Sequence, residues 1–263
     1  MKSLHITTLI LHNAAENSTT FLLGSQKPNL VGYNTSETPD AGKKLLGGSF
    51  ITVGSKGSFK LSDLKVDSDG EYTSGDFELQ TLTTSGATKD KYCWFYNKKH
   101  GGTSGNAGWY DPDGEVQYVD DTDVEFEAGS GFWTAGSGLK LVCNGQVLTD
   151  TTVKVGTPDA GKVLIGNPFP VDINLVDLFV DSNDEYTSGD FEIQTLTTSG
   201  ATQNKYCWFY NKKHGGTSGV AGWYDPDGEV LYTREDNIIL PAGGAYWVAG
   251  SGLTLVFPQL NLK

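Results

Sequence analysis

The sequence predicts an all-β protein made of two tandem β-sandwich or jelly-roll-like domains that follow an N-terminal strand arm. Three observations favour this fold class: a long internal repeat, short runs in which apolar and polar residues alternate, and a composition rich in glycine and aromatic residues. Of the 263 residues, 34 are glycine and 11% are aromatic. Such a composition is typical of short strands joined by tight turns.

The repeat divides the chain. Residues 71–116 align without gaps with residues 185–230, and 42 of the 46 aligned positions are identical. A repeat of roughly 110 residues has the size of a domain, so it predicts two domains and not a solenoid. We expect an N-terminal arm over residues 1–37, a first β domain over residues 38–147 and a second, duplicate β domain over residues 148–263.

Alternating side chains predict the strands within each repeat unit. Residues 77–83 alternate between apolar and polar, as a half-buried strand does. In the strand expected over residues 91–97, Tyr92 and Trp94 share one face and Cys93 lies on the other. Further strands are expected over residues 108–110, 115–118, 124–127 and 139–142, with an Asp-Pro-Asp-Gly turn at residues 111–114 and a short helical stretch over residues 172–179.

The first 37 residues have no partner in the repeat. Residues 4–12 have the pattern of a strand, and an isolated strand is not stable in water, so it must pair with something. It either completes its own first domain or adds to an exposed edge of the next subunit by β-strand addition. The apolar residues of this assembly arm are Leu4, Ile6, Leu9, Ile10 and Leu11.

Three short motifs of the second repeat unit carry a resemblance. Residues 166–170 are Gly-Asn-Pro-Phe-Pro, residues 222–225 are Gly-Trp-Tyr-Asp, and residues 241–247 are Pro-Ala-Gly-Gly-Ala-Tyr-Trp. Together they resemble uncharacterised β-rich repeat modules of bacterial secreted or surface proteins. The first repeat unit departs from the pattern, with Gly-Gly-Ser-Phe at residues 47–50. The resemblance implies no activity.

The search for catalytic residues gives little. Cys93 and Cys207 occupy equivalent positions, each seven residues before a histidine. One interpretation of each cysteine and its histidine is a Cys-His nucleophilic pair. Flanking aromatic residues favour a small buried side chain instead. Whether these are free thiols, and whether Lys98 or Lys99 forms an isopeptide bond with an asparagine, stay open. No phosphate loop, zinc motif or nucleophile elbow occurs in the sequence, so we expect a protein that is not an enzyme.

Two sets of residues are candidates for ligand binding. Trp109 and Trp223 adjoin the predicted hairpin turns, where aromatic rings could stack on sugars, so a carbohydrate-binding or adhesive module is an alternative function. Oxygen donors that could form weak calcium sites occur twice, although a turn explains them equally well. These donors are Asp67, Asp69, Asp181 and Asp184.

Charge and valency point to a structural role. The net charge of −13 argues against a nucleic-acid partner, and no apolar run reaches the roughly 18 residues of a membrane-inserted helix. Duplicated domains are common where valency or length is the function. We expect a self-assembling homopolymer that forms an extracellular or surface filament or layer, although residues 1–11 make a poor signal peptide. A viral structural component is a further alternative, and glycans are the other expected partners.

Overall fold

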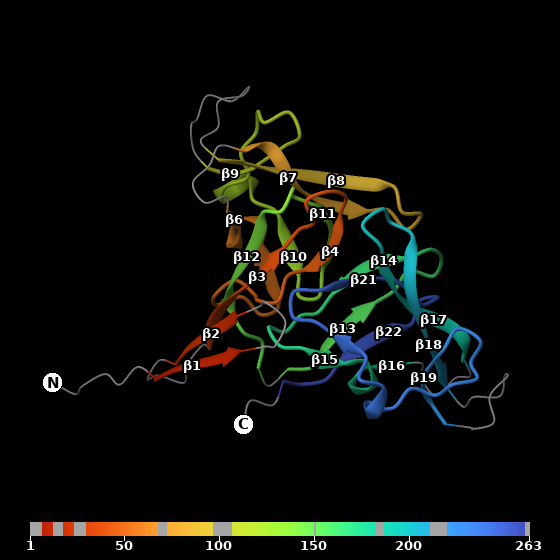
Figure 1. Cartoon of the computed structure of the whole chain (residues 1–263). Helices are drawn as coiled ribbons and strands as arrows, with labels where there is room; N and C mark the ends of the chain where they lie inside the picture. The colour runs from red at the N-terminus through yellow and green to blue at the C-terminus, as the bar shows by residue number, and fades with distance from the viewer. Residues whose placement is uncertain are drawn as a thin grey trace.

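The computed structural model describes residues 7–12, 18–23, 30–67, 73–96, 107–149, 151–181, 187–210 and 220–260 (Figure 1). Strands make up 50% of the protein, all strand pairs are antiparallel, and the described residues contain no α-helix. The predicted all-β class is therefore confirmed. None of the helical turns described is long and apolar enough to cross a membrane.

The first module (residues 38–147), together with three strands of the arm before it, forms two five-stranded sheets. One sheet has the spatial order β1 (Thr7–His12), β2 (Ser18–Leu23), β3 (Val31–Glu37), β12 (Lys140–Gln146), β6 (Leu64–Asp67). The other has the order β4 (Lys44–Gly47), β11 (Gly131–Ala135), β7 (Thr73–Leu82), β8 (Thr88–Tyr96), β9 (Gly108–Tyr110). A small sheet pairs β5 (Ser58–Lys60) with β10 (Glu125–Glu127), and single 3-10 turns form η1 (Leu61–Asp63) and η2 (Asp120–Thr122).

The second module (residues 148–263) repeats this plan with three strands in place of five in its first sheet. Its first sheet has the order β13 (Val153–Gly156), β22 (Thr254–Phe257), β16 (Phe179–Asp181). Its second sheet has the order β14 (Val163–Gly166), β21 (Ala245–Ala249), β17 (Thr187–Leu196), β18 (Thr202–Tyr210), β19 (Gly222–Tyr224). The small sheet pairs β15 (Ile173–Asn174) with β20 (Ile239–Leu240), and the 3-10 turns are η3 (Leu175–Asp177) and η4 (Arg234–Asp236). The helical stretch expected over residues 172–179 is thus the single turn η3.

The four main sheets are arranged like the blades of a small propeller, and two separate tandem sandwiches are not clearly present. The physical reason is the extensive contact between the modules. Strands β4 and β11 of the first module pack against β14 and β21 of the second, in the middle of the molecule (Figure 1). Tandem position in the sequence does not separate the modules in space.

Each module has its own aromatic core. In the first, the rings of Trp94 and Trp109 meet edge to face with centroids 5.3 Å apart. In the second, Trp208 and Trp223 repeat this contact at the same separation. The faces of β8 are as predicted: Tyr92 and Trp94 enter the main core, while Cys93 and Phe95 pack with Tyr110 in a small cluster on the other face. Both faces of this strand are therefore buried.

The two modules meet across an approximate two-fold axis. The N–H of Lys43 donates to the carbonyl oxygen of Thr198 at 2.9 Å, and the equivalent N–H of Lys162 donates to that of Thr84 at the same distance. At the centre, Gly47 and Gly166 face each other so closely that a Cβ built on Gly47 would lie 2.7 Å from the Cα of Gly166. Only glycine lets the two backbones approach to this distance.

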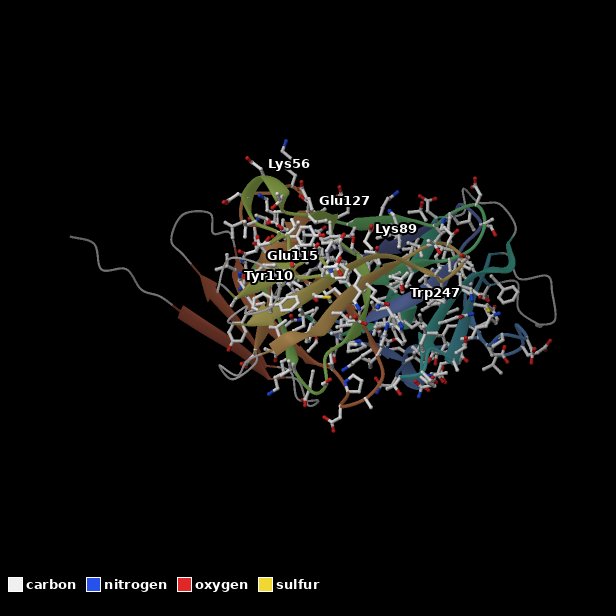
Figure 2. The ribbon with its side chains drawn as sticks, turned by 90° about the horizontal axis from the view of Figure 1, so that it is seen from above. Lys56, Lys89, Tyr110, Glu115, Glu127 and Trp247 are labelled. Atoms are coloured by element: carbon white, nitrogen blue, oxygen red, sulfur yellow. The ribbon has the colours of Figure 1, made fainter. Side chains whose placement is uncertain are left out.

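Apolar side chains complete the junction between the modules. Leu45 and Leu164 lie in one buried cluster, with Trp133 and Trp247 packed beside them. Figure 2 shows Trp247 where the β7–β8 hairpin passes over the strands of the second module. A Cβ on Gly86, in the turn of that hairpin, would lie 3.7 Å from the Trp247 ring. The two modules therefore share a continuous apolar contact.

The N-terminal arm extends a sheet of its own chain. Strand β1 pairs along its whole length with β2, and β2 pairs with β3. Strand β3 pairs with β12 as β13 pairs with β22, so the expected boundary after residue 37 follows a strand that has a counterpart in the second module. Of the predicted arm residues, Leu9, Ile10 and Leu11 lie in β1, whereas Leu4 and Ile6 lie outside the described residues.

Candidate functional site

The two tryptophans expected to stack on sugars are core residues. Trp109 and Trp223 are each 1% exposed. The indole N–H of Trp109 donates to the carbonyl oxygen of Leu64 at 2.8 Å, and that of Trp223 donates to Leu178 at 2.9 Å. The prediction of a stacking platform at these positions is wrong, because their rings fill the space between the two main sheets of each module.

The cysteines have the properties of packed side chains. Cys93, Cys143 and Cys207 are free and buried. Burial raises the pKa of Cys93 and of Cys207 to about 11, and that of Cys143 to about 12. A thiol that stays protonated at neutral pH is a poor nucleophile. The histidines seven residues after Cys93 and Cys207, and the segment holding Lys98 and Lys99, lie outside the described residues.

The expected calcium ligands are only partly described. Asp181 accepts a hydrogen bond from the Lys154 ammonium at 3.1 Å. Asp69 and Asp184 lie outside the described residues, while Asp67 lies at the end of β6. Within the described ranges, no three His, Cys, Asp or Glu side chains gather as a metal site would require. Weak calcium binding stays a prediction.

A partly buried carboxylate between two lysines occurs once in each module. In the first, Glu78 on β7 contacts Lys91 on β8 and lies 3.4 Å from the Nζ of Lys43. The amide of Gln80 donates to the same carboxylate at 2.8 Å. In the second module, the corresponding residues are Glu192, Lys205, Lys162 and Gln194.

These clusters are ionic and not nucleophilic. Burial alone would raise the pKa of Glu78, but the hydrogen bonds and charges of Lys91 and Lys43 outweigh it and hold that pKa below its ordinary value. The hydrogen bond from Lys91 to Glu78 in turn raises the pKa of Lys91. Because the amine stays protonated, the cluster cross-links strands beside the module junction and offers no free base or nucleophile.

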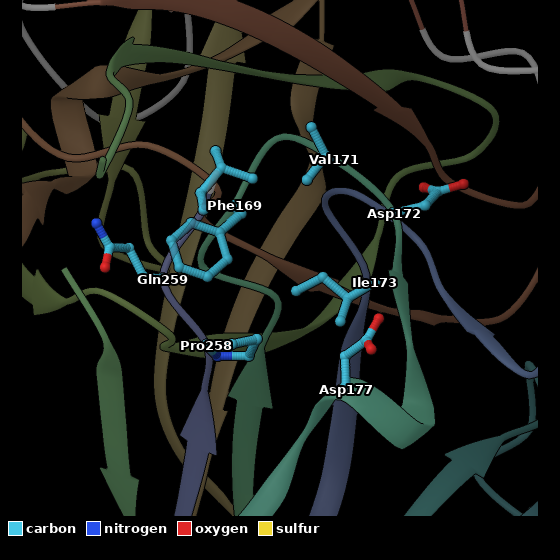
Figure 3. A pocket seen from close by; sticks show the side chains of 8 residues that line it. Phe169, Val171, Asp172, Ile173, Asp177, Pro258 and Gln259 are labelled. Carbon is cyan, nitrogen blue, oxygen red and sulfur yellow. The ribbon is translucent and has the colours of Figure 1, made fainter. Parts of the chain in front are cut away.

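The described part of the chain also contains a pocket of about 340 Å³, in the second module (Figure 3). Its walls are mostly apolar, and two carboxylates belong to its lining. The lining residues are Phe169, Val171, Asp172, Ile173, Asp177, Pro258, Gln259 and Leu260. Figure 3 shows the Phe169 ring between Val171 and Pro258, with the carboxylate of Asp172 pointing away from the ring at the rim.

Two prolines distinguish the second module from the first near this pocket. In the first module, Ile51 and Gln146 exchange two backbone hydrogen bonds of 2.9 and 2.8 Å, which tie the end of β12 to the segment after β4. The equivalent positions in the second module are Pro170 and Leu260, and Pro258 ends β22 at Phe257. Since proline has no N–H, Pro170 cannot repeat the bond that Ile51 donates. Residues on either side of Pro170, together with residues 258–260, line the pocket.

The Gly-Asn-Pro-Phe-Pro motif supports one wall of this pocket. The Asn167 amide donates to the carbonyl oxygen of Val171 at 2.8 Å, and its own carbonyl oxygen accepts from the N–H of Phe169 at 3.0 Å. Gly48 occupies this position in the first module, where the ring of Phe59 fills the space of a side chain. The Asn167 side chain thus holds the turn of this motif, and the turn forms one wall of the pocket.

The pocket carries a partly compensated negative charge. One oxygen of Asp172 accepts a hydrogen bond from the N–H of Ala242 at 2.9 Å. Asp177 forms an ion pair with Arg234. Asp172 therefore contributes the negative charge at the rim that no cation of the described residues pairs with in a salt bridge. The sequence signal for the pocket is Pro258, directly after the end of a strand.

Comparisons of the chain with protein-family models, with curated proteins and with solved structures found no match.

Proposed function

We propose that the protein is a non-enzymatic structural subunit that assembles with copies of itself, at a cell surface or outside the cell, by β-strand addition through its N-terminal arm. The proposal includes the finer description of the fold as two sandwich-like modules fused at one junction. The observation that carries it is the position of β1. This strand is the outermost of its five-stranded sheet and pairs only with β2, and no other described strand lies along its outer edge.

The free edge of β1 has the chemistry that strand addition requires. Backbone N–H and C=O groups on an outer edge are unpaired and can bind an extended strand of another molecule. The surroundings of the cysteines and of the lysines support the non-enzymatic part of the proposal. The cysteines are buried with raised pKa values, and the lysines beside Glu78 and Glu192 are ion-paired.

The first experiment is sedimentation velocity and negative-stain electron microscopy of the full-length protein at neutral pH, over a range of concentrations. We expect fibres, sheets or a concentration-dependent series of oligomers. Removal of residues 1–12 should leave a folded monomer. A full-length protein that stays monomeric at high concentration would overturn the proposal.

A pair of proline variants tests which edge of β1 acts. Successive N–H groups of a strand point to opposite edges, so Leu9→Pro and Ile10→Pro remove donors from different sides of β1. One variant should block assembly and leave the hairpin with β2 intact, and the other should weaken the hairpin. If neither variant changes the assembly of the full-length protein, the edge of β1 is not the contact.

A further inference from the structure

We propose that the side-chain amide of Asn34, on β3, binds ordered water in the interior of the protein beside the module junction. The inference goes beyond the proposed function and does not rest on it. Asn34 is 0% exposed, and no described group forms a hydrogen bond with its amide nitrogen or its carbonyl oxygen. Burial of an amide without a hydrogen-bond partner is costly, so a buried water is the usual partner of such a group.

Five buried positions in β3 and the first module are polar or small where their equivalents are apolar. The pairing of β3 with β12 matches that of β13 with β22, so the two modules can be compared position by position. We call the five residues the polar set: Asn34, Ser36, Ser49, Thr134 and Cys143. Their equivalents are Val153, Val155, Pro168, Val248 and Phe257. The hydroxyl of Thr134 is a second buried group of the set without a described partner.

The surroundings of the amide admit only a small ligand. A Cβ on Gly243 of the second module would lie 3.1 Å from the Nδ2 of Asn34 and 2.5 Å from the Oγ of Ser36. The N–H of Gly243 donates to the Oγ of Ser49 at 2.9 Å, and this hydroxyl donates to the carbonyl oxygen of Asn167 at 3.3 Å. Because these groups already lie so close together, a ligand that reaches the amide must be as small as water.

The ligand must also be neutral. The polar set contains amide, hydroxyl and thiol groups and no carboxylate or ammonium. Burial raises the pKa of Cys143 to about 12, so its thiol stays protonated at neutral pH. A buried ion without an opposite charge is strongly disfavoured. Water is neutral and both donates and accepts hydrogen bonds, as the two ends of an amide require.

The equivalent contact on the other side of the junction is apolar. Gly129 of the first module occupies the position of Gly243, and a Cβ on it would lie 2.8 Å from the Cγ2 of Val155 and 3.8 Å from the Cγ1 of Val153. The approximate two-fold axis thus relates a polar contact to an apolar one. We expect water at the polar contact alone.

A crystal structure of the full-length protein, at a resolution that reveals ordered water, tests the site directly. We expect water within hydrogen-bond distance of the Asn34 side chain and none beside Val153. Direct hydrogen bonds from protein groups to both ends of the amide would overturn the inference. An amide with no solvent density beside it would also overturn it.

Water magnetic relaxation dispersion counts long-lived buried waters in solution and gives a second, independent test. Asn34→Val copies the second module and should lose at least one long-lived water. Thr35→Val, the next residue of β3 and on its opposite face, is the matched control and should lose none. An equal count in Asn34→Val and the unsubstituted protein would contradict the inference. Neither measurement depends on assembly, so the proposed function can fail while the water site stands.

Discussion

The contact between Gly47 and Gly166 allows a quantitative test of the module junction. We expect Gly166→Ala to destabilise the protein, because the new methyl carbon would lie 2.6 Å from the carbonyl oxygen of Ser130 and 2.8 Å from the Cα of Gly47. Both neighbours are backbone atoms, so they cannot rotate out of the way. Ordinary contact begins near 3.4 Å, which requires a movement of several tenths of an ångström.

The magnitude follows from two opposing effects. Overpacking of a close contact costs about 1–3 kcal/mol, and backbone neighbours place this case at the upper end. Alanine is favoured over glycine within a strand by about 0.5–1 kcal/mol. The net loss in the free energy of unfolding is therefore about 2 kcal/mol, which corresponds to a fall in Tm of roughly 4–8 °C for a chain of this size.

Urea unfolding followed by tryptophan fluorescence measures this loss, and Gly156→Ala is the matched control. Gly156 also lies in a strand, but a Cβ there would meet nothing within 4 Å. The control should therefore be neutral or stabilised by about 0.5 kcal/mol. If Gly166→Ala is as stable as Gly156→Ala, the two modules do not approach as described. The double variant with Gly47→Ala should lose less than the sum of the single losses, because both substitutions disturb one contact.

Three further predictions concern buried or partly buried polar groups. Trp223→Phe should lower the free energy of unfolding by about 1–3 kcal/mol, since it leaves the Leu178 carbonyl without its donor, and urea unfolding measures it. The pKa of Glu78 and of Glu192 is held below the ordinary value, so these carboxylates stabilise the folded protein fully above pH 4.5. This stabilisation is lost as the pH falls through the folded-state pKa. Between pH 7 and pH 3, the unfolding midpoint of Glu78→Gln should therefore fall less steeply than that of the unsubstituted protein. The native thiols should not react with Ellman's reagent at pH 8, and all three should react in denaturant.

Each of these predictions has a result that contradicts it. A stable Trp223→Phe variant would mean that water or another donor satisfies the carbonyl of Leu178. An unchanged acid slope in Glu78→Gln would mean that the lysines do not stabilise the ionised carboxylate. Rapid labelling of a thiol in the native protein would mean that its strand opens readily, since burial alone keeps it protonated.

Local patterns in the sequence predicted most of the strands, because alternation depends only on neighbouring residues. The strand expected over residues 115–118 was wrong: only Gln117 pairs there, as an isolated bridge with Tyr110. The alternation around Tyr92 and Cys93 placed these side chains on opposite faces of β8, and the structure has them in two different clusters. The small size of Cys93 between aromatic neighbours predicted burial, which is also observed. Repeat identity predicted a duplicate second domain, and the sheet β14-β21-β17-β18-β19 matches the sheet β4-β11-β7-β8-β9 strand for strand.

The tryptophan prediction failed because position next to a turn does not decide exposure. Trp109 is separated from the Asp-Pro-Asp-Gly turn by one residue, which suggested a surface ring. In the structure β9 pairs with β8, and this pairing places the ring against Trp94 and Phe77. The strand that pairs with β9 determines which face of β9 is covered, and a single sequence does not show which strand that is.

The module junction and the pocket depend on contacts between residues far apart in the sequence. Gly47 and Gly166 occupy equivalent places in the repeat, but glycine is abundant in this chain and gave no reason to single out this pair. Pro258 was visible as the residue after a strand, yet its consequence requires knowing that Gln146 pairs with Ile51 in the other module. Local patterns in the sequence predicted neither feature, because the residues in contact are far apart along the chain.

The approximate two-fold junction has a consequence for how such a protein can change over time. In a dimer of identical chains, every substitution appears twice and must suit both halves of the interface at once. Covalent linkage removes that condition, since each half is encoded separately. Pro170 and Pro258 in one module, with Ile51 and Asn144 in the other, are substitutions of this kind. Fusion of the two halves thus permits the two ends of the molecule to differ.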